Sequence, residues 1–271
     1  MIVAAVAFII LFWTPLATLL RDWWHDPEAG HGLLLGPLSL WFMWRRRIVA
    51  GAAPQVVLGL VVLVGAVLLR YAAGLAAELF TLRLSLWLAI VGLTVFVWGI
   101  RQVLHWWLPL TLLALSLPLP ALVIGALSYP LQLQASEIGA AMLAWRHVPV
   151  HLSGNIIALP GQSLFVTEAC SGLRSLTALL ALGVLISGLW LRRPWVRAIL
   201  VIAAIPVAIL INGVRVFLTG FLVYFVDPAL GQGFMHLSEG FAMFGVAFAI
   251  LAALAWLLSS GEGLMDRRRR T

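Results

Sequence analysis

Residues 198–226 read AILVIAAIPVAILINGVRVFLTGFLVYFV and contain one charged side chain, Arg215. A helix needs about 20 apolar residues to cross the hydrocarbon core of a bilayer. At 1.5 Å per residue this run would be about 43 Å long, which is more than the core requires. The run therefore predicts a transmembrane helix and places the chain among integral membrane proteins.

The rest of the chain has the same apolar character. Its 271 residues are 63% hydrophobic and 10% charged, with a mean hydropathy of +1.08. Average soluble domains are about 25% charged, so the composition excludes a soluble globule, a disordered chain and a coiled coil. We predict an all-α polytopic membrane protein with about eight transmembrane helices in a single membrane domain, residues 1–271. The other seven spans are expected at 2–20, 30–44, 55–74, 79–100, 106–127, 172–190 and 237–258.

The arginines indicate how these spans are oriented. All 17 basic residues are Arg, and eleven of them follow even-numbered predicted spans. Because Lys and Arg concentrate in cytoplasmic loops, both termini are expected in the cytoplasm and residues 128–171 outside. This topology explains the net charge of +7, and we expect the lipid bilayer rather than nucleic acid as a partner. The eleven are in residues 45–47, at Arg101, Arg192, Arg193 and Arg197, and in residues 267–270.

Residues 128–171 are the only long segment between predicted spans. Residues 128–145 carry apolar side chains at helical spacing, which predicts a small amphipathic helix at the membrane surface. Residues 149–167 alternate apolar and polar side chains around two turn sequences, Ser153-Gly154-Asn155 and Pro160-Gly161, which predicts a hairpin. The segment ends in TEACSG, residues 167–172, directly before a predicted span.

Cys170, within that last sequence, is the first candidate for chemistry. A free Cys is most often a small buried apolar residue, but the start of a helix favours its thiolate. Arg174, one helical turn further, would add a positive charge. Glu168 would oppose ionisation, so we expect it to bind the loop or Arg174. Because the chain has a single Cys, an intrachain disulfide and a thiolate metal site are excluded, and we expect no metal or cofactor.

Arg215 is the second candidate. A charged side chain within a membrane costs about 2.5–3.5 kcal/mol on insertion scales, so it marks either a functional group or a structural ion pair, with Glu239 or Asp22. Asn212, Arg215 and Thr219 fall at i, i+3 and i+7 and form a polar stripe on one helix face.

His236 is the third candidate, at the outer start of the last predicted span. An interfacial His is commonly only a polar anchor, but an imidazole changes charge near neutral pH and suits a base. Together, Cys170, His236 and Arg215 could supply a nucleophile, a proton shuttle and an oxyanion donor.

These sequences resemble the exosortase/archaeosortase family of membrane cysteine transpeptidases. The resemblance rests on EACSGLRS (168–175), NGVR (212–215), His236, and the segment from Asp26-Pro27 to His31-Gly32. In that family the matching Cys is the proposed nucleophile, and the matching Arg and His complete the site. A His at the third position implies the bacterial branch. We take four further residues as supporting: Arg174, Asn212, His31 and Glu168.

The resemblance implies a function. Such an enzyme would process membrane-anchored proteins that end in a Pro-Glu-Pro-type motif, a transmembrane helix and an Arg-rich tail. It would lie in the bacterial inner membrane with its site on the periplasmic side. The derived topology agrees, because a substrate helix with its Arg tail inside would present the motif level with Cys170.

Two other classes of protein remain open. A polytopic transporter or a lipid or polysaccharide export subunit could use Arg215 to bind an anionic headgroup. That alternative explains the basic inner loops but gives no role to the Cys-Ser-Gly sequence before a helix. A rhomboid-like serine protease would need a Ser in a G-x-S-G-type setting, and no Ser in this chain has that sequence.

Overall fold

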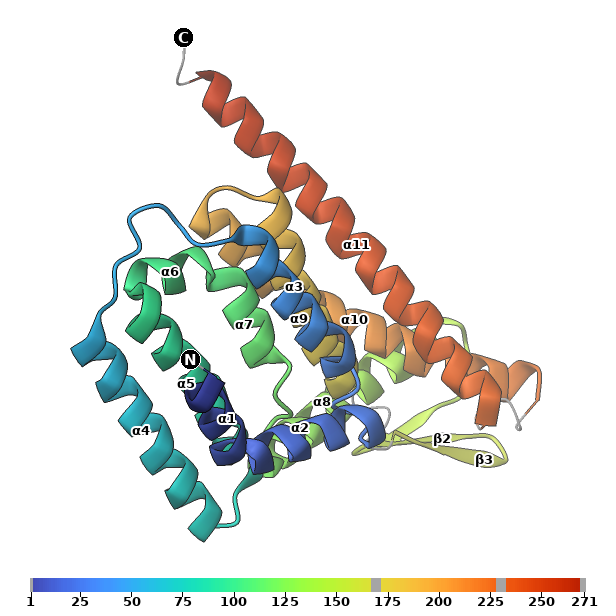
Figure 1. Ribbon diagram of the computed structural model, residues 1–271. Helices are drawn as coiled ribbons and strands as arrows, with labels where there is room; N and C mark the ends of the chain where they lie inside the picture. The colour runs from blue at the N-terminus through green and yellow to red at the C-terminus, as the bar shows by residue number, and fades with distance from the viewer. Residues whose placement is uncertain (1, 167–171, 228–232, 269–271) are drawn as a thin grey trace. The chain divides into compact units, whose positions relative to one another are not determined.

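The computed structural model describes residues 2–166, 172–227 and 233–268 (Figure 1). The Cα positions divide into two compact units, Met1–Pro120 and Ala121–Thr271. Both units are mainly helical, which confirms the prediction of an all-α membrane protein. The organisation as a single membrane domain stays a prediction.

The first unit is made of helices joined by short turns. Its longest helices, α4 and α5, confirm the spans expected at 55–74 and 79–100. In chain order the helices are α1 (Ile2–Leu11), α2 (Trp13–His25), α3 (Gly32–Arg46), α4 (Val56–Leu75), α5 (Leu79–Trp98), α6 (Ile100–His105) and α7 (Trp107–Leu115).

The second unit combines long helices with a small sheet. Its helices α9 and α10 confirm the spans expected at 172–190 and 198–226, and α11 contains the span expected at 237–258. The elements are α8 (Ala121–Trp145), β1 (His151–Ser153), β2 (Ile156–Leu159), β3 (Gln162–Phe165), α9 (Leu173–Trp190), α10 (Pro194–Phe225) and α11 (Gly233–Arg268).

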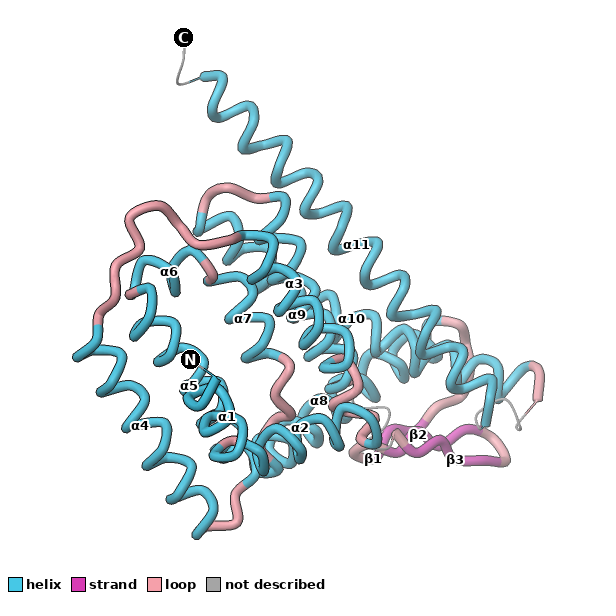
Figure 2. The backbone as a smooth tube through the Cα atoms, viewed as in Figure 1, coloured by secondary structure: helices cyan, strands magenta, loops and turns pink. Residues whose placement is uncertain are grey.

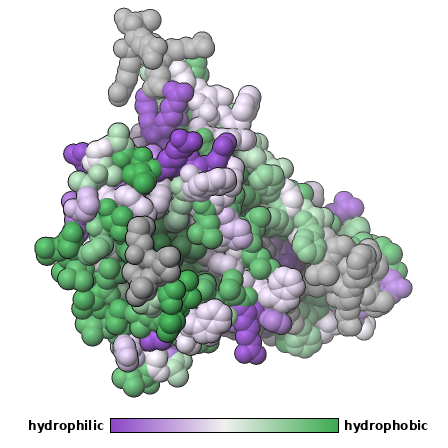
Figure 3. Space-filling model, viewed as in Figure 1, coloured by the Kyte–Doolittle hydropathy of each residue, from purple (hydrophilic) through white to green (hydrophobic). Residues whose placement is uncertain are grey.

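Within the described residues, five helices are long and apolar enough to cross a membrane. They are α4, α5, α9, α10 and residues Gly240–Met265 of α11. Apolar side chains remain exposed along these helices, for example Val57 and Leu68 on α4, a region that is green in Figure 3. Lipid tails are the environment that such exposed surfaces require. The chain is therefore a multi-pass membrane protein, and the count of eight spans stays a prediction.

Two predicted spans are wrong as single helices. The span expected at 106–127 is interrupted, because α7 ends at Leu115 and α8 begins at Ala121. Pro118 and Pro120 lie in the break; each lacks a backbone N–H and biases the preceding residue away from helical angles. The span expected at 2–20 is divided at Phe12, between α1 and α2.

Glycines let the helices of the first unit approach closely. A Cβ atom on Gly59 of α4 would lie 2.6 Å from the Cβ of Phe96 on α5, and one on Gly92 would lie 3.1 Å from Leu63. Small residues at such crossings let backbones pack tightly inside a membrane, where apolar burial alone drives little association. The α4–α5 pair is the main helix contact of this unit.

Asp22, one of the two carboxylates named above as a structural partner for Arg215, pairs with Arg83 in the first unit. Asp22 accepts a hydrogen bond from the guanidinium of Arg83 at 2.7 Å, and Arg83 is only 3% exposed. A buried charge of this kind requires a partner, and within the first unit Asp22 is that partner. Arg83 therefore illustrates what a structural intramembrane arginine looks like in this chain.

In the second unit, α10 is the central helix and contacts α8, α9 and α11. It crosses α8 at glycines: a Cβ on Gly139 would lie 2.6 Å from Val216, and one on Gly213 would lie 2.6 Å from the Cβ of Ile138. The segment predicted as a helix at 128–145 is the C-terminal part of α8, which begins earlier, at Ala121. Its position at the membrane surface stays a prediction.

The predicted hairpin is confirmed and extended by one strand. The order of the antiparallel sheet is β1-β2-β3, and Figure 2 shows its strands (magenta) at one end of the helices of this unit. Ile157 and Leu159 of β2 are buried in one cluster with Leu143 of α8 and Val223 of α10. The sheet thus packs against the ends of α8 and α10.

Candidate active site

The polar stripe on α10 is buried. Asn212, Arg215 and Thr219 are 5%, 9% and 3% exposed, although most residues of the helix that carries them are apolar. The hydroxyl of Thr219 donates to the carbonyl oxygen of Arg215 at 3.0 Å. This confirms the stripe predicted from the i, i+3, i+7 spacing and directs it toward protein, away from lipid.

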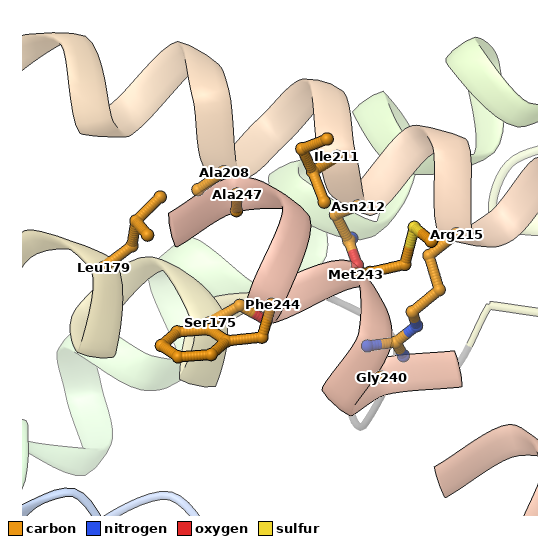
Figure 4. A pocket seen from close by; sticks show the side chains of 10 residues that line it. All are labelled: Ser175, Leu179, Ala208, Ile211, Asn212, Arg215, Gly240, Met243, Phe244 and Ala247. Atoms are coloured by element: carbon orange, nitrogen blue, oxygen red, sulfur yellow. The ribbon is translucent and has the colours of Figure 1, made fainter. Parts of the chain in front are cut away.

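Arg215 and Asn212 line a pocket between α9, α10 and α11 (Figure 4). Figure 4 shows the Arg215 side chain extending from α10 toward α11, where its guanidinium lies beside Gly240. Apolar groups form most of the wall, so a charge in this pocket interacts more strongly with a neighbouring charge than it would in water. The other lining residues are Ser175, Leu179, Ala208, Ile211, Met243, Phe244 and Ala247.

Gly172, two residues after Cys170, packs closely against α10. It precedes the first residue of α9 and has a φ of +80°, a left-handed conformation that costs Gly little. A Cβ at this position would also lie 2.6 Å from Cγ and 2.7 Å from Nδ2 of Asn212. Both the backbone angle and the contact therefore require glycine two residues after Cys170.

Asn212 thus has two neighbours from different parts of the site. One is Gly172, and the other is Arg215, one helical turn further along α10. A second, smaller pocket between α8, α9 and α10 is lined by Leu131, Gly172, Leu176 and Asn212, among others. Asn212 therefore lies where the two pockets meet, next to the chain that leaves the cysteine segment.

Gly240 provides a similar connection from α11. A Cβ on Gly240 would lie 3.9 Å from Nη1 of Arg215, so this backbone is in contact distance of the guanidinium. His236 precedes Gly240 by four residues in α11, which is about one helical turn. The backbone of α11 at Gly240 is therefore close to Arg215.

Several predicted site residues fall outside what the structure describes. Cys170 and Glu168 lie in residues 167–171, which are not among the described residues, and the side chains of His236 and Glu239 are likewise not described. The roles of Cys170 and His236 therefore stay predictions. The structure does describe a sequence neighbour of each. Gly172, two residues after Cys170, contacts Asn212, and Gly240, four residues after His236, lies beside Arg215.

Two supporting residues, Arg174 and His31, are not among the described residues that line the Arg215 pocket. Arg174 is exposed on the first turn of α9, whereas Ser175 and Leu179 of the same helix line the pocket. His31 belongs to the first unit, where its Nε2 donates to the carbonyl oxygen of Leu115 at 3.1 Å. In the described part of the chain, His31 thus has a structural contact at the end of α7.

The apolar residues of the pocket were not predicted from the sequence. The pocket residues recur at i, i+3, i+4 and i+7, as 208, 211, 212 and 215 of α10 and as 240, 243, 244 and 247 of α11, and of these only Asn212 and Arg215 are polar. That spacing is the signature of one helix face turned toward a partner. It was hidden because the surrounding residues are also apolar, so no contrast marked the face.

The described residues contain no group of three His, Cys, Asp or Glu side chains that could hold a metal ion.

Comparison with known proteins identifies the family. Residues 23–253 match the model of the family described as "Transmembrane exosortase (Exosortase_EpsH)". No curated protein and no solved structure matches the chain. Since the match covers most of the 271 residues, this chain belongs to the transmembrane exosortase family.

Proposed function

We propose that the chain is a membrane-embedded cysteine peptidase and transpeptidase that removes C-terminal sorting signals from membrane-anchored proteins. The observation that carries this proposal is the contact between Gly172 and Asn212. It ties the segment that follows Cys170 to the turn of α10 that precedes Arg215. A nucleophile two residues before Gly172 and a buried cation three residues after Asn212 would suit acyl transfer.

In the proposed reaction, the thiolate of Cys170 attacks the carbonyl carbon of the scissile peptide bond. The carbonyl electron pair moves to oxygen, and the guanidinium of Arg215 donates hydrogen bonds to the resulting oxyanion. Collapse of this intermediate breaks the C–N bond, and the leaving amine takes a proton from the imidazolium of His236. Water or an amine then attacks the thioester, gives its proton to His236 and releases Cys170.

The setting of Arg215 supports its proposed role. Its planar group presents directed N–H donors, and a largely apolar pocket keeps competing water away from them.

The proposed substrate carries a Pro-Glu-Pro-type motif, one transmembrane helix and an Arg-rich tail. The enzyme would lie in the bacterial inner membrane with both termini in the cytoplasm, and cleavage would occur on the periplasmic side. The distribution of arginines supports this orientation, because eleven of the 17 follow even-numbered predicted spans.

The test is cleavage of a tagged substrate co-expressed with the wild-type chain, Cys170→Ala or Cys170→Ser. Both variants should leave the substrate at full length while their membrane abundance stays normal, since a hydroxyl of ordinary pKa replaces a thiolate poorly. Ser260→Ala, on an exposed position of α11, is the matched control and should cleave normally. Cleavage by Cys170→Ala would end the cysteine-peptidase assignment, and no cleavage by the wild-type chain would favour the transporter class.

A further inference from the structure

Strand β3 has one edge that the second unit leaves open. The sheet order β1-β2-β3 places β3 at a border, and no described residue of this unit pairs with its outer edge. β1 and β2 both pack on α8, whereas the main contacts of β3 are with β2. The outer edge of β3 is therefore available for main-chain pairing.

The register identifies which backbone groups face outward. Ile157 pairs with Leu164 and Leu159 with Gln162 across the Pro160-Gly161 turn. Beyond the strand, the N–H of Val166 donates to the carbonyl oxygen of Asn155 at 2.9 Å. Even-numbered residues of this segment thus turn their N–H and C=O groups toward β2. In an antiparallel pair the alternate residues point the other way, so Ser163 and Phe165 present theirs to the open edge.

Two further features distinguish this edge. The side chains of Ser163 and Phe165 are exposed, and Phe165 is 60% exposed although it is aromatic. In the sequence, Cys170 follows Phe165 by five residues. An apolar side chain and unpaired main-chain groups therefore precede the proposed nucleophile.

We propose that the outer edge of β3 binds the substrate peptide as an added strand, with Ser163 and Phe165 supplying the main-chain hydrogen bonds. This inference rests on the function proposed above. Strand addition gives affinity through the backbone of an extended peptide, and pockets for alternate side chains give specificity. In an extended Pro-Glu-Pro-type motif, the backbone nitrogens of the two prolines, which carry no hydrogen, face the same edge of the peptide. The N–H and C=O groups of the central Glu face the other edge and can therefore form hydrogen bonds with β3.

The lone Cys allows a direct test of this binding mode. Cys170→Ala leaves the full chain without cysteine, so single cysteines can be introduced as Ser163→Cys or Phe165→Cys. Each is combined with substrates that carry one cysteine at successive positions around the motif, and a short thiol-to-thiol cross-linker joins nearby pairs. Trp145→Cys, on an exposed position at the end of α8, measures cross-linking by random collision.

An added strand predicts cross-links at alternate substrate positions, because neighbouring side chains lie on opposite faces. Phe165→Cys should give the same alternation shifted by two positions relative to Ser163→Cys. Yields no higher than those of Trp145→Cys, or cross-links at consecutive positions without alternation, would overturn the proposal. Since this assay reads binding by an inactive chain, its outcome is separate from whether Cys170 is the nucleophile.

Proline variants test the same edge through activity. Ser163→Pro removes an N–H that points outward, and edge strands tolerate such a proline. Cleavage should fall about tenfold or more with unchanged membrane abundance. Leu164→Pro removes an N–H that points to β2 and should lower abundance instead. Wild-type cleavage by Ser163→Pro would overturn the proposal, and if that variant does not accumulate, the cross-linking pattern decides.

Discussion

Replacing Arg215 by lysine is the sharpest test of the site, because it keeps the charge and changes the geometry. Arg215 is 9% exposed, and its guanidinium lies beside the Gly240 backbone in a largely apolar pocket. Arginine holds directed donors in one plane there, whereas a lysine ammonium is a flexible point charge that is harder to desolvate. Loss of one oxyanion donor typically costs about 10²–10³ in rate. We therefore expect Arg215→Lys to cleave at about 1% of the wild-type rate or less.

The assay measures the ratio of cleaved to full-length substrate over time, together with membrane abundance and melting temperature in detergent. Arg83→Lys is the matched control, since Arg83 is also buried but pairs with Asp22 at 2.7 Å. That variant keeps an ion pair, so any effect should appear in abundance or melting temperature, with cleavage per molecule unchanged. His236→Ala should resemble Arg215→Lys, because proton transfer contributes about 10²–10⁴ in rate.

A structural role for Arg215 gives the opposite pattern. Arg215→Lys would then cleave normally, and Arg215→Ala would reduce the amount of protein in the membrane. Cleavage by Arg215→Lys at more than about half the wild-type rate, at equal abundance, would refute the oxyanion argument.

Four further predictions concern packing, capping and topology. Glu262 of α11 accepts hydrogen bonds from the backbone N–H groups of Arg192 and Arg193 at 3.0 and 2.8 Å. Glu262→Ala should lower the melting temperature, because each buried donor left without an acceptor costs about 1–3 kcal/mol of folding free energy. Glu262→Gln keeps an acceptor and should lower the melting temperature less. Gly213→Ala should destabilise the α8–α10 contact, since its Cβ would lie 2.6 Å from the Cβ of Ile138, whereas Gly125→Ala meets nothing within 4 Å and should be neutral. Glu78 caps α5, and its hydrogen bond with the Thr81 side chain lowers the pKa of the Glu78 carboxyl. The stabilising effect of this carboxylate should be complete above the ordinary pKa of a glutamate and be lost as pH falls through the lowered value. The difference in melting temperature between the wild-type chain and Glu78→Ala should therefore shrink in acid. Reporter fusions should read inside, outside, inside and inside after Arg47, Arg146, Arg197 and Arg270 respectively, and an inside signal after Arg146 would contradict the proposed site on the outer face.

How much of the fold could be predicted depended on apolar length. The helices α4, α5, α9 and α10 agree with expected spans because each is a continuous apolar run of membrane length. The span expected at 106–127 failed because hydropathy averages over Pro118 and Pro120, whose effect is on backbone angles. The break between α1 and α2 at Phe12 has a similar signal in Pro15, which has no N–H for the carbonyl oxygen of Leu11 and disrupts a continuous helix there.

The candidate site was predictable where it is polar. A charge in an apolar run is conspicuous, so Asn212, Arg215 and Thr219 stood out from spacing alone. Their apolar neighbours, such as Leu179 and Met243, carry no contrast with residues that face lipid. Partners brought together by tertiary packing were also hidden: nothing in the spacing showed that Asp22 pairs with Arg83.

The contact between Gly172 and Asn212 gives a physical reason why two separate sequence motifs occur in one chain. The cysteine motif contains Gly172, which has a φ of +80° and directly precedes α9 at the point where the chain contacts α10. The second motif supplies Asn212 at that meeting point and Arg215 one turn later. A Cβ on residue 172 would lie 2.6 Å from Cγ of Asn212, so a side chain there could not keep this contact. The glycine of the first motif and the asparagine of the second therefore belong to one packing contact, and the reactive groups proposed on either side depend on it.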